Sequence, residues 1–195
     1  MKKLYCFDFD GTLTKKDTLF LFLRSYNSSR YFRAYLKHLP LFIFLKINLL
    51  EAEAVKRSFV NAVLKGEKKH KLEEAANAFF EQMYPHLIRE AAIEFIDSIP
   101  RETVDSVIVT ASLDLWAQPF AKYWNMELLS TEMLYENGVY TGKFKTKNCN
   151  GREKVNRVEE FLQNRKYDKV IAFGDSTGDQ ALFRYASESH FKFFH

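Results

Sequence analysis

The sequence predicts an α/β fold built around a parallel β-sheet. Three apolar runs carry this prediction, and each ends in a polar loop: residues 4–7, 107–109 and 170–173. Continuous apolar runs of this length are typical of parallel strands that are buried on both faces. In open sheets of this kind, ligands bind beyond the carboxyl ends of the strands. The polar loops after these runs therefore form the candidate site.

The first run leads into the segment Asp8-Phe9-Asp10-Gly11-Thr12. Because residues i and i+2 of a strand point to the same side, Asp8 and Asp10 can face one small volume. Two carboxylates this close repel, so one tends to hold a proton unless a cation lies between them. The pair indicates a proton-sharing dyad or a metal site. The simpler alternative is a solvated turn after an edge strand.

The chain from about residue 14 to residue 85 is predicted to be mostly helical. Apolar residues recur there at spacings of three and four, as in Phe20 and Leu23. Turns are expected at residues 27–29 and at Gly66.

The first half of this helical stretch is strongly basic. Residues 15–50 contain seven basic residues and one acidic residue, a net charge of +6 in a chain whose total is +4. The apolar run 39–50 is too short to span a bilayer, but its composition suits a membrane surface. One hypothesis is that this region docks on anionic lipid and admits a lipid phosphate. The alternative is that the apolar residues form a helical core and the basic ones a solvated face or an anion funnel.

The later apolar runs lead into further polar loops. Residues 110–112 follow the second run, and Ser112 is expected to cap the next helix. Residues 174–179 follow the third run, and Lys154 lies at the start of a helical stretch that extends to Leu162.

Four motifs now stand in order along the whole chain. They are Asp8-x-Asp10-Gly11-Thr12, Thr110 after a strand, Lys154 on a helix, and Gly174-Asp175-x-x-x-Asp179. This order resembles the haloacid dehalogenase (HAD) superfamily, subfamily IB, and is closest to its phosphoserine-phosphatase-like branch. The apolar segment near residue 40 is also similar to the cap of bacterial phosphatidylglycerophosphate phosphatases.

The resemblance implies a Rossmann-like catalytic core of residues 1–15 and 86–195. Its five strands would lie in the order 5-4-1-2-3. Residues 16–85 would form a helical cap of the C1 type, inserted after the first strand, that covers the site and selects substrates.

The resemblance also implies a Mg²⁺-dependent phosphatase that hydrolyses a phosphate monoester through an aspartyl-phosphate intermediate. Asp8 would be the nucleophile and Asp10 the general acid and base. A side-chain oxygen of Asp8, the backbone carbonyl of Asp10 and the carboxylate of Asp175 would hold Mg²⁺. Asp179 would orient Asp175, a metal-bound water or Lys154 from behind, and it is alternatively an N-cap.

Phosphate oxygens would be bound by the Thr110 hydroxyl, the Ala111 N–H and Lys154. Thr110 is alternatively a helix cap, and Arg152 is an alternative phosphate cation. Asp17 and Arg57 are possible substrate contacts, because phosphoserine phosphatases place an acid soon after the first motif and an arginine in the cap. Asp17 is alternatively the N-cap of the first cap helix.

The remaining features bound the function without specifying it. A tight hairpin is predicted at residues 133–140 near the edge of the sheet, with no assigned chemistry, and a last strand at 189–194. Two isolated cysteines and scattered histidines predict neither disulfides nor a zinc site.

The partner is expected to be a small phosphorylated substrate, and a lipid phosphate is one candidate. No nucleic acid and no membrane span are expected, and the predicted compartment is cytoplasmic. A phosphomutase, a phospho-accepting signalling module and a non-catalytic phosphate-binding scaffold are the rivals.

Overall fold

The computed structural model describes residues 2–46 and 52–195. Its centre is a five-stranded parallel sheet, and its strands lie in the order β3-β2-β1-β6-β7. The strand bounds are β1 Lys3–Phe7, β2 Val104–Leu113, β3 Glu127–Thr131, β6 Lys169–Gly174 and β7 Glu188–Phe191. Numbered by their place among the five core strands and read from β7, this order is 5-4-1-2-3. The predicted α/β fold and its strand order are confirmed.

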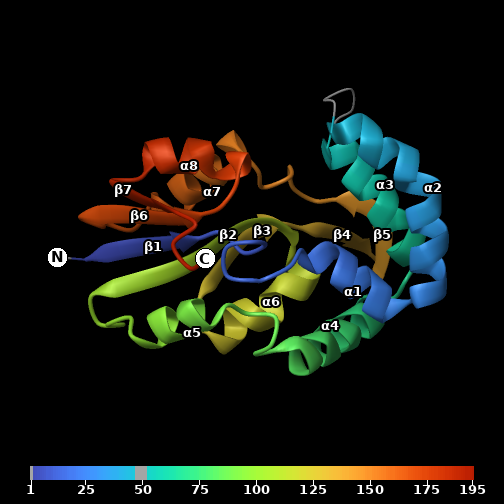
Figure 1. The fold of residues 1–195 in the computed structure, drawn as a ribbon, viewed down its shortest axis with the longest axis horizontal. Coiled ribbons are helices and arrows are strands. Elements are labelled where there is room, and N and C mark those ends of the chain that lie inside the picture. Colours follow the sequence, from blue (N-terminus) through green and yellow to red (C-terminus); the bar gives the residue numbers. More distant parts are fainter. Residues whose placement is uncertain (1, 47–51) are drawn as a thin grey trace.

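Helices cover both faces of this sheet (Figure 1). Helices α5 (Glu90–Asp97) and α6 (Asp114–Tyr123) lie on one face, and α7 (Arg152–Leu162) and α8 (Gln180–Tyr185) on the other. The alternation of β1 explains this arrangement: Cys6 packs into the cluster that contains residues of α7 and α8, and Phe7 packs into the larger cluster on the opposite face. The continuous apolar run of β1 is therefore buried on both sides.

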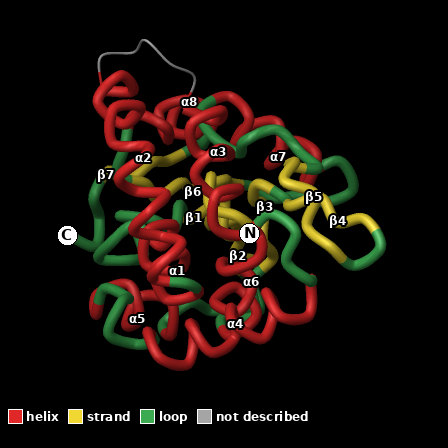
Figure 2. Tube along the Cα trace, turned by 90° about the vertical axis from the view of Figure 1, so that its right-hand side faces the viewer, coloured by secondary structure: helices red, strands yellow, loops and turns green. Residues whose placement is uncertain are grey.

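Four helices follow β1 and lie beyond the carboxyl ends of the strands (Figures 1 and 2). They are α1 (Thr18–Tyr26), α2 (Ser28–Lys46), α3 (Ala52–Leu64) and α4 (Lys69–Met83). We call them the cap. The turn expected at residues 27–29 consists of one residue, Asn27, between α1 and α2. The turn expected at Gly66 is present, and Gly66 has a φ of +83°. The end of the predicted apolar run, residues 47–50, lies outside the described residues.

The cap packs on the core through aromatic side chains. Phe22 of α1 stacks on Trp116 of α6 with ring centroids 5.1 Å apart. Inside the cap, Phe59 of α3 contacts Phe20 and Phe42 with centroids 5.7 and 5.4 Å away. Several aromatic residues of the basic segment therefore form a helical core.

The predicted hairpin consists of β4 (Met133–Glu136) and β5 (Val139–Phe144), and both residues of its Asn137-Gly138 turn have positive φ. It does more than extend from the sheet edge, because it is bonded to the cap. The backbones of Tyr140 and Glu67 share a hydrogen bond of 3.0 Å, and the Asn61 side chain donates to the Gly142 carbonyl at 2.8 Å.

The last strand is shorter than predicted. It ends at Phe191 because Lys192 adopts a left-handed conformation with φ of +53°. The chain then turns, and Phe194 packs into the core against Phe173. Within the described residues, no helix combines the length and the apolar character that crossing a membrane requires.

Candidate active site

Three carboxylates gather where β1 and β6 end. Asp8 follows β1 and Asp175 follows β6, and these neighbouring strands pair in register, Phe7 opposite Phe173. Asp179 lies in a short 3₁₀ turn, Thr177–Asp179, just beyond. Asp8, Asp175 and Asp179 each offer an oxygen, and these oxygens all lie within 4.8 Å of one another. The parallel sheet thus brings together residues that are about 170 positions apart in the chain.

The loop after β1 fits closely against Asp175. Gly11 has a φ of +81°, and a Cβ there would overlap the Asp175 carboxylate. The Thr12 hydroxyl lies 3.1 Å from Oδ2 of Asp8 and 3.3 Å from Oδ1 of Asp175. Gly11 therefore leaves room for the Asp175 carboxylate, and the Thr12 hydroxyl is within hydrogen-bonding distance of Asp8 and Asp175.

Lys154 pairs with two of these carboxylates. Its side chain is buried, and its Nζ lies 2.6 Å from Oδ1 of Asp8 and 2.6 Å from Oδ1 of Asp179. Burial alone would lower the pKa of Lys154, but the two carboxylates raise it above its usual range. Burial raises the pKa of Asp8 to about 7, against the opposing effect of Lys154. Arg152, the alternative cation, is instead on the surface beside Glu159.

Asp179 organises the loop that carries Asp175. Its Oδ2 accepts hydrogen bonds from the backbone N–H groups of Asp175 and Ser176, at 3.1 and 3.0 Å, and from the Ser176 hydroxyl. Ser176 is the N-cap of the 3₁₀ turn and Asp179 its third residue, so the two form a capping box. Because its other oxygen binds Lys154, Asp179 has both oxygens engaged.

The side chain of Asp10 turns toward the cap. Its Oδ1 accepts from the backbone N–H of Thr18, the first residue of α1, at 2.7 Å, and its Oδ2 accepts from the Ser112 hydroxyl. Burial, and next the charge of Asp17, raise the pKa of Asp10 to about 6, whereas the bonds from Ser112 and Thr18 act in the opposite direction. The Trp116 indole N–H lies within 3.2 Å of the Thr18 hydroxyl and of the Ser112 hydroxyl, and it fixes these two hydroxyl groups in place.

The expectation that Ser112 caps the following helix is wrong. Leu113 occupies the N-cap of α6 without a side-chain bond, because β2 continues through Ser112 and directs its hydroxyl toward Asp10. A signal for this role was present in the sequence. Thr110 and Ser112 are two positions apart on a strand and so face the same side.

Comparisons with known proteins agree with this geometry. The family model for haloacid dehalogenase-like hydrolases matches residues 6–184. The chain belongs to this family. Protein CicA of Caulobacter vibrioides is 32% identical over 193 residues, which are 98% of this chain and 86% of CicA. The membership of the haloacid dehalogenase superfamily that the four motifs imply is confirmed.

Solved structures show the same fold. A Bordetella pertussis Tohama I protein of unknown function superposes with a TM-score of 0.81 at 19% identity and covers 97% of this chain and 89% of its own. A structure described as a phospho-aspartyl intermediate analogue of phosphoserine phosphatase has a TM-score of 0.67 at 19% identity, with coverages of 96% and 85%.

In this HAD-family chain, two of the three residues predicted to bind phosphate, Thr110 and Ala111, lie near the end of β2, whereas Lys154 lies on α7. The buried Thr110 hydroxyl accepts from the Ser112 N–H at 3.0 Å, so it does not cap α6. The Ala111 carbonyl accepts from the Thr131 hydroxyl at 2.9 Å and from the ammonium group of Lys56. The strand end is thereby held by β3 and by the cap.

Lys56 is a site residue that the sequence analysis missed. It reaches from α3 to the Ala111 carbonyl and also lies 3.2 Å from Oδ1 of Asn148. Burial lowers its pKa to about 8, with Asp10 and Asp17 opposing. Its neighbour Arg57, the predicted substrate contact, is exposed and lies 3.4 Å from Glu53. A substrate contact by Arg57 stays a prediction.

Asp17 has the capping role that was weighed as its alternative. Its carboxylate accepts from the Leu19 N–H at 2.9 Å at the start of α1. Burial raises the pKa of Asp17, and the positive charge of Lys56 acts in the opposite direction. A direct contact with substrate stays a prediction.

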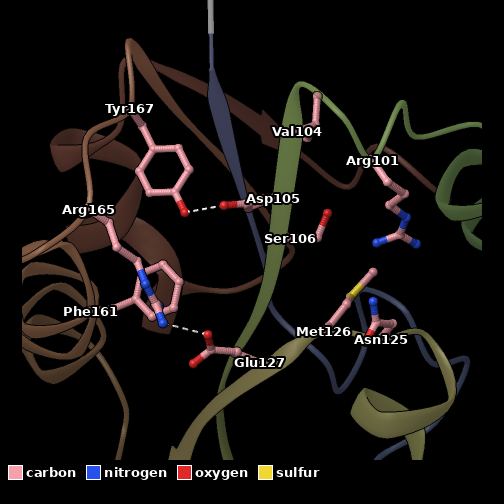
Figure 3. A pocket seen from close by; sticks show the side chains of 10 residues that line it. All are labelled: Arg101, Val104, Asp105, Ser106, Asn125, Met126, Glu127, Phe161, Arg165 and Tyr167. Atoms are coloured by element: carbon pink, nitrogen blue, oxygen red, sulfur yellow. Dashed lines mark hydrogen bonds and ion pairs between the residues drawn. The ribbon is translucent and has the colours of Figure 1, made fainter.

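A separate cavity of about 410 Å³ lies at the opposite end of the sheet (Figure 3). Arg101 and Arg165 line it, together with residues at the amino ends of β2 and β3. Tyr167 donates to Asp105, and Arg165 pairs with Glu127 at 2.7 Å. None of the candidate catalytic residues lines this cavity.

Proposed function

We propose that this protein is a Mg²⁺-dependent phosphatase that hydrolyses phosphate monoesters through an aspartyl-phosphate formed on Asp8. The observation that carries the proposal is the position of Asp8. It lies at the end of the central strand, 2.6 Å from a buried ammonium group and beside the Asp175 carboxylate. A buried carboxylate between a cation and a cluster of acids is a suitable nucleophile for phosphorus.

The donor set fits a divalent cation. Three carboxylates, those of Asp8, Asp175 and Asp179, lie together with one ammonium group from the core, Lys154, and this leaves excess negative charge. Oxygen ligands in a small number are what Mg²⁺ binds. The side chains of Asp8 and Asp175 and the backbone carbonyl of Asp10 would hold it. The cation would offset the repulsion between a carboxylate and a dianionic phosphoryl group.

The residues of the chain account for the remaining chemistry. An oxygen of Asp8 attacks phosphorus, and the bond to the leaving oxygen breaks. Asp10 gives that oxygen a proton and later takes one from the water that hydrolyses the aspartyl-phosphate. A pKa near 6 suits an acid that must be protonated in part near neutral pH. Thr110, Ala111 and Lys154 bind the phosphate oxygens throughout.

The cap supports a substrate with a second anionic group. Lys56 brings a partly buried cation from α3 to the end of β2, where a leaving group would lie. The carboxylate of phosphoserine and the second phosphate of a phosphatidylglycerophosphate-type lipid both have this chemistry. The similarity in fold to phosphoserine phosphatase supports the first, and the basic, apolar first half of the cap supports the second.

Turnover of p-nitrophenyl phosphate with Mg²⁺ tests the reaction, and Asp8→Asn is the decisive variant. We expect a loss of at least about 10³-fold in kcat, as for other covalent nucleophiles. Asp97→Asn, at an exposed aspartate of α5, is the matched control and should retain activity. A single stoichiometric phosphorylation without turnover would support a signalling module instead. Phosphate transfer to a second hydroxyl of a sugar would support a phosphomutase.

The physiological substrate needs a comparison of kcat/KM across four classes of phosphate ester. The panel contains phosphoserine, sugar phosphates, nucleotides and lipid phosphates. If Lys56 binds a second anionic group of the substrate, Lys56→Met lowers kcat/KM for the preferred doubly anionic ester much more than for p-nitrophenyl phosphate.

A further inference from the structure

Cap helix α2 presents an apolar stripe to solvent. Four side chains at spacings of four, three and four form it, which places them on one face of the helix. Their exposed fractions are Phe32 49%, Leu36 69%, Leu39 43% and Ile43 58%. Among the described residues, eight large hydrophobic side chains are at least 36% exposed, and half of them belong to this one helix. We call these four residues the α2 stripe.

The stripe is not a part of the cap core. A different face of α2 packs inward, where Tyr31, Ala34 and His38 are buried and Phe42 contacts Phe59. The inward face of the helix is therefore already buried against the cap core, and the helix carries a second apolar face. A continuous apolar face of this kind on a solvent-exposed surface usually marks an interaction site.

Basic side chains lie beside the stripe. Helix α2 contains no aspartate or glutamate, and Arg33 and Lys37 are exposed on it. Together with Arg30, Ala34 and Ala62 they line a cleft of about 320 Å³. Arg30 pairs with Glu67, whereas within residues 2–46 and 52–195 neither Arg33 nor Lys37 lies within 4.0 Å of a carboxylate. The cleft is open to an external anion.

We propose that α2 docks this protein on the surface of an anionic lipid bilayer. The stripe enters the boundary between headgroups and acyl chains, and Arg33 and Lys37 bind lipid phosphates beside it. An apolar face bordered by cations is the pattern of helices that lie in this interface. The proposal concerns a surface outside the catalytic residues and does not depend on the proposed reaction.

Charge distinguishes a lipid surface from a second copy of this chain. In a symmetric dimer through the stripe, each α2 would face another α2 that also has no acidic residue. Arg33 and Lys37 would then lie near their own equivalents without compensation, which is unfavourable. An anionic bilayer supplies the missing negative charge together with the apolar layer.

Vesicle co-sedimentation tests the proposal with the full chain. The probes are vesicles of 30% phosphatidylglycerol in phosphatidylcholine, and pure phosphatidylcholine, each at low and at high salt. The stripe variant is Leu36→Gln with Ile43→Gln, and the charge variant is Arg33→Gln with Lys37→Gln. The matched controls are Phe191→Gln, an equally exposed apolar residue of β7, and Lys122→Gln with Lys166→Gln.

The wild-type chain should bind anionic vesicles at low salt, and less at high salt. We expect the charge variant to bind about 30-fold more weakly. The stripe variant should bind about 100-fold more weakly. The controls should bind as the wild type does. Hydrolysis of soluble p-nitrophenyl phosphate, if the proposed reaction holds, and far-UV circular dichroism in any case, show that each variant is folded.

Three results would overturn the proposal. They are no binding by the wild type at low salt, equal binding to neutral and anionic vesicles, and equal loss in variants and controls. A dimer detected by light scattering that the stripe variant abolishes, without vesicle binding, would assign the stripe to a second copy. Because vesicle binding needs no turnover, its failure is separable from a failure of the proposed phosphatase.

Discussion

The ammonium group of Lys56, on cap helix α3, donates a hydrogen bond to the backbone carbonyl of Ala111, at the end of β2. This contact joins the cap to the strand that carries Thr110. Since Lys56 is partly buried, the charge of this one side chain affects both the contact between the cap and β2 and the field at the site.

The pH dependence of kcat/KM should reveal this charge. Burial lowers the pKa of Lys56 to about 8, so the ammonium form is present below that pH and is lost as the pH rises through it. We expect an alkaline decrease in kcat/KM centred near pH 8. In Lys56→Arg the decrease should move to higher pH, and in Lys56→Met it should vanish while kcat/KM at neutral pH falls. An unchanged profile in both variants, as in the control Lys71→Met on α4, would contradict this role.

Ser112→Ala should impair the acid–base step rather than folding. The Ser112 hydroxyl holds Oδ2 of Asp10, and this bond favours the ionised carboxylate. Its removal should lower kcat by roughly 10- to 100-fold, a part of what general acid–base catalysis contributes. It should also raise the pKa of Asp10, so the limb of the pH–kcat profile that reports Asp10 moves to higher pH.

Ser106→Ala, on the same strand, is the matched control, because the Ser106 hydroxyl is buried and has no hydrogen-bond partner among residues 2–46 and 52–195. The pH profile is decisive, since a merely structural serine would change kcat without moving the limb.

Lys154→Met should destabilise the protein strongly in the absence of divalent cations. The substitution leaves the carboxylates of Asp8 and Asp179 buried without their cation. Breaking a buried pair in this way costs about 3–5 kcal/mol of unfolding free energy, measurable by urea denaturation. Arg152→Met, two positions earlier at an exposed ion pair, should change it by less than about 1 kcal/mol. Equal effects of the two substitutions would contradict the assignment of Lys154 as the buried cation.

Mg²⁺ should stabilise the wild-type chain and be required for turnover. A ligand that binds only the folded state at 100 times its Kd adds about 2.7 kcal/mol, so we expect Tm to rise by roughly 5–10 °C. Asp175→Asn removes one proposed ligand and should abolish most of this rise, whereas Asp97→Asn should retain it. EDTA should stop hydrolysis, and added Mg²⁺ should restore it. An equal rise of Tm in Asp175→Asn would place the ion elsewhere.

The sequence by itself determined the fold class, the strand order implied by the family, and the positions of the acidic motifs. Local rules suffice for the fold class and the acidic motifs, whereas the strand order came from the family resemblance. Strands such as 4–7 are recognisable because both faces are buried, and Asp8, Asp175 and Asp179 follow strands whose ends meet in any parallel sheet.

Only the tertiary structure decided which neighbour of a pair reaches the site. Lys56 and Arg57 are adjacent cations, and Ser112 resembled a helix cap, so their roles depend on where α3 and β2 lie against each other. The exposure of the α2 stripe likewise required the packed cap, because apolar spacing marks a helix face without saying whether that face is covered. Such outcomes depend on contacts between segments far apart in the chain, and local sequence patterns do not encode them.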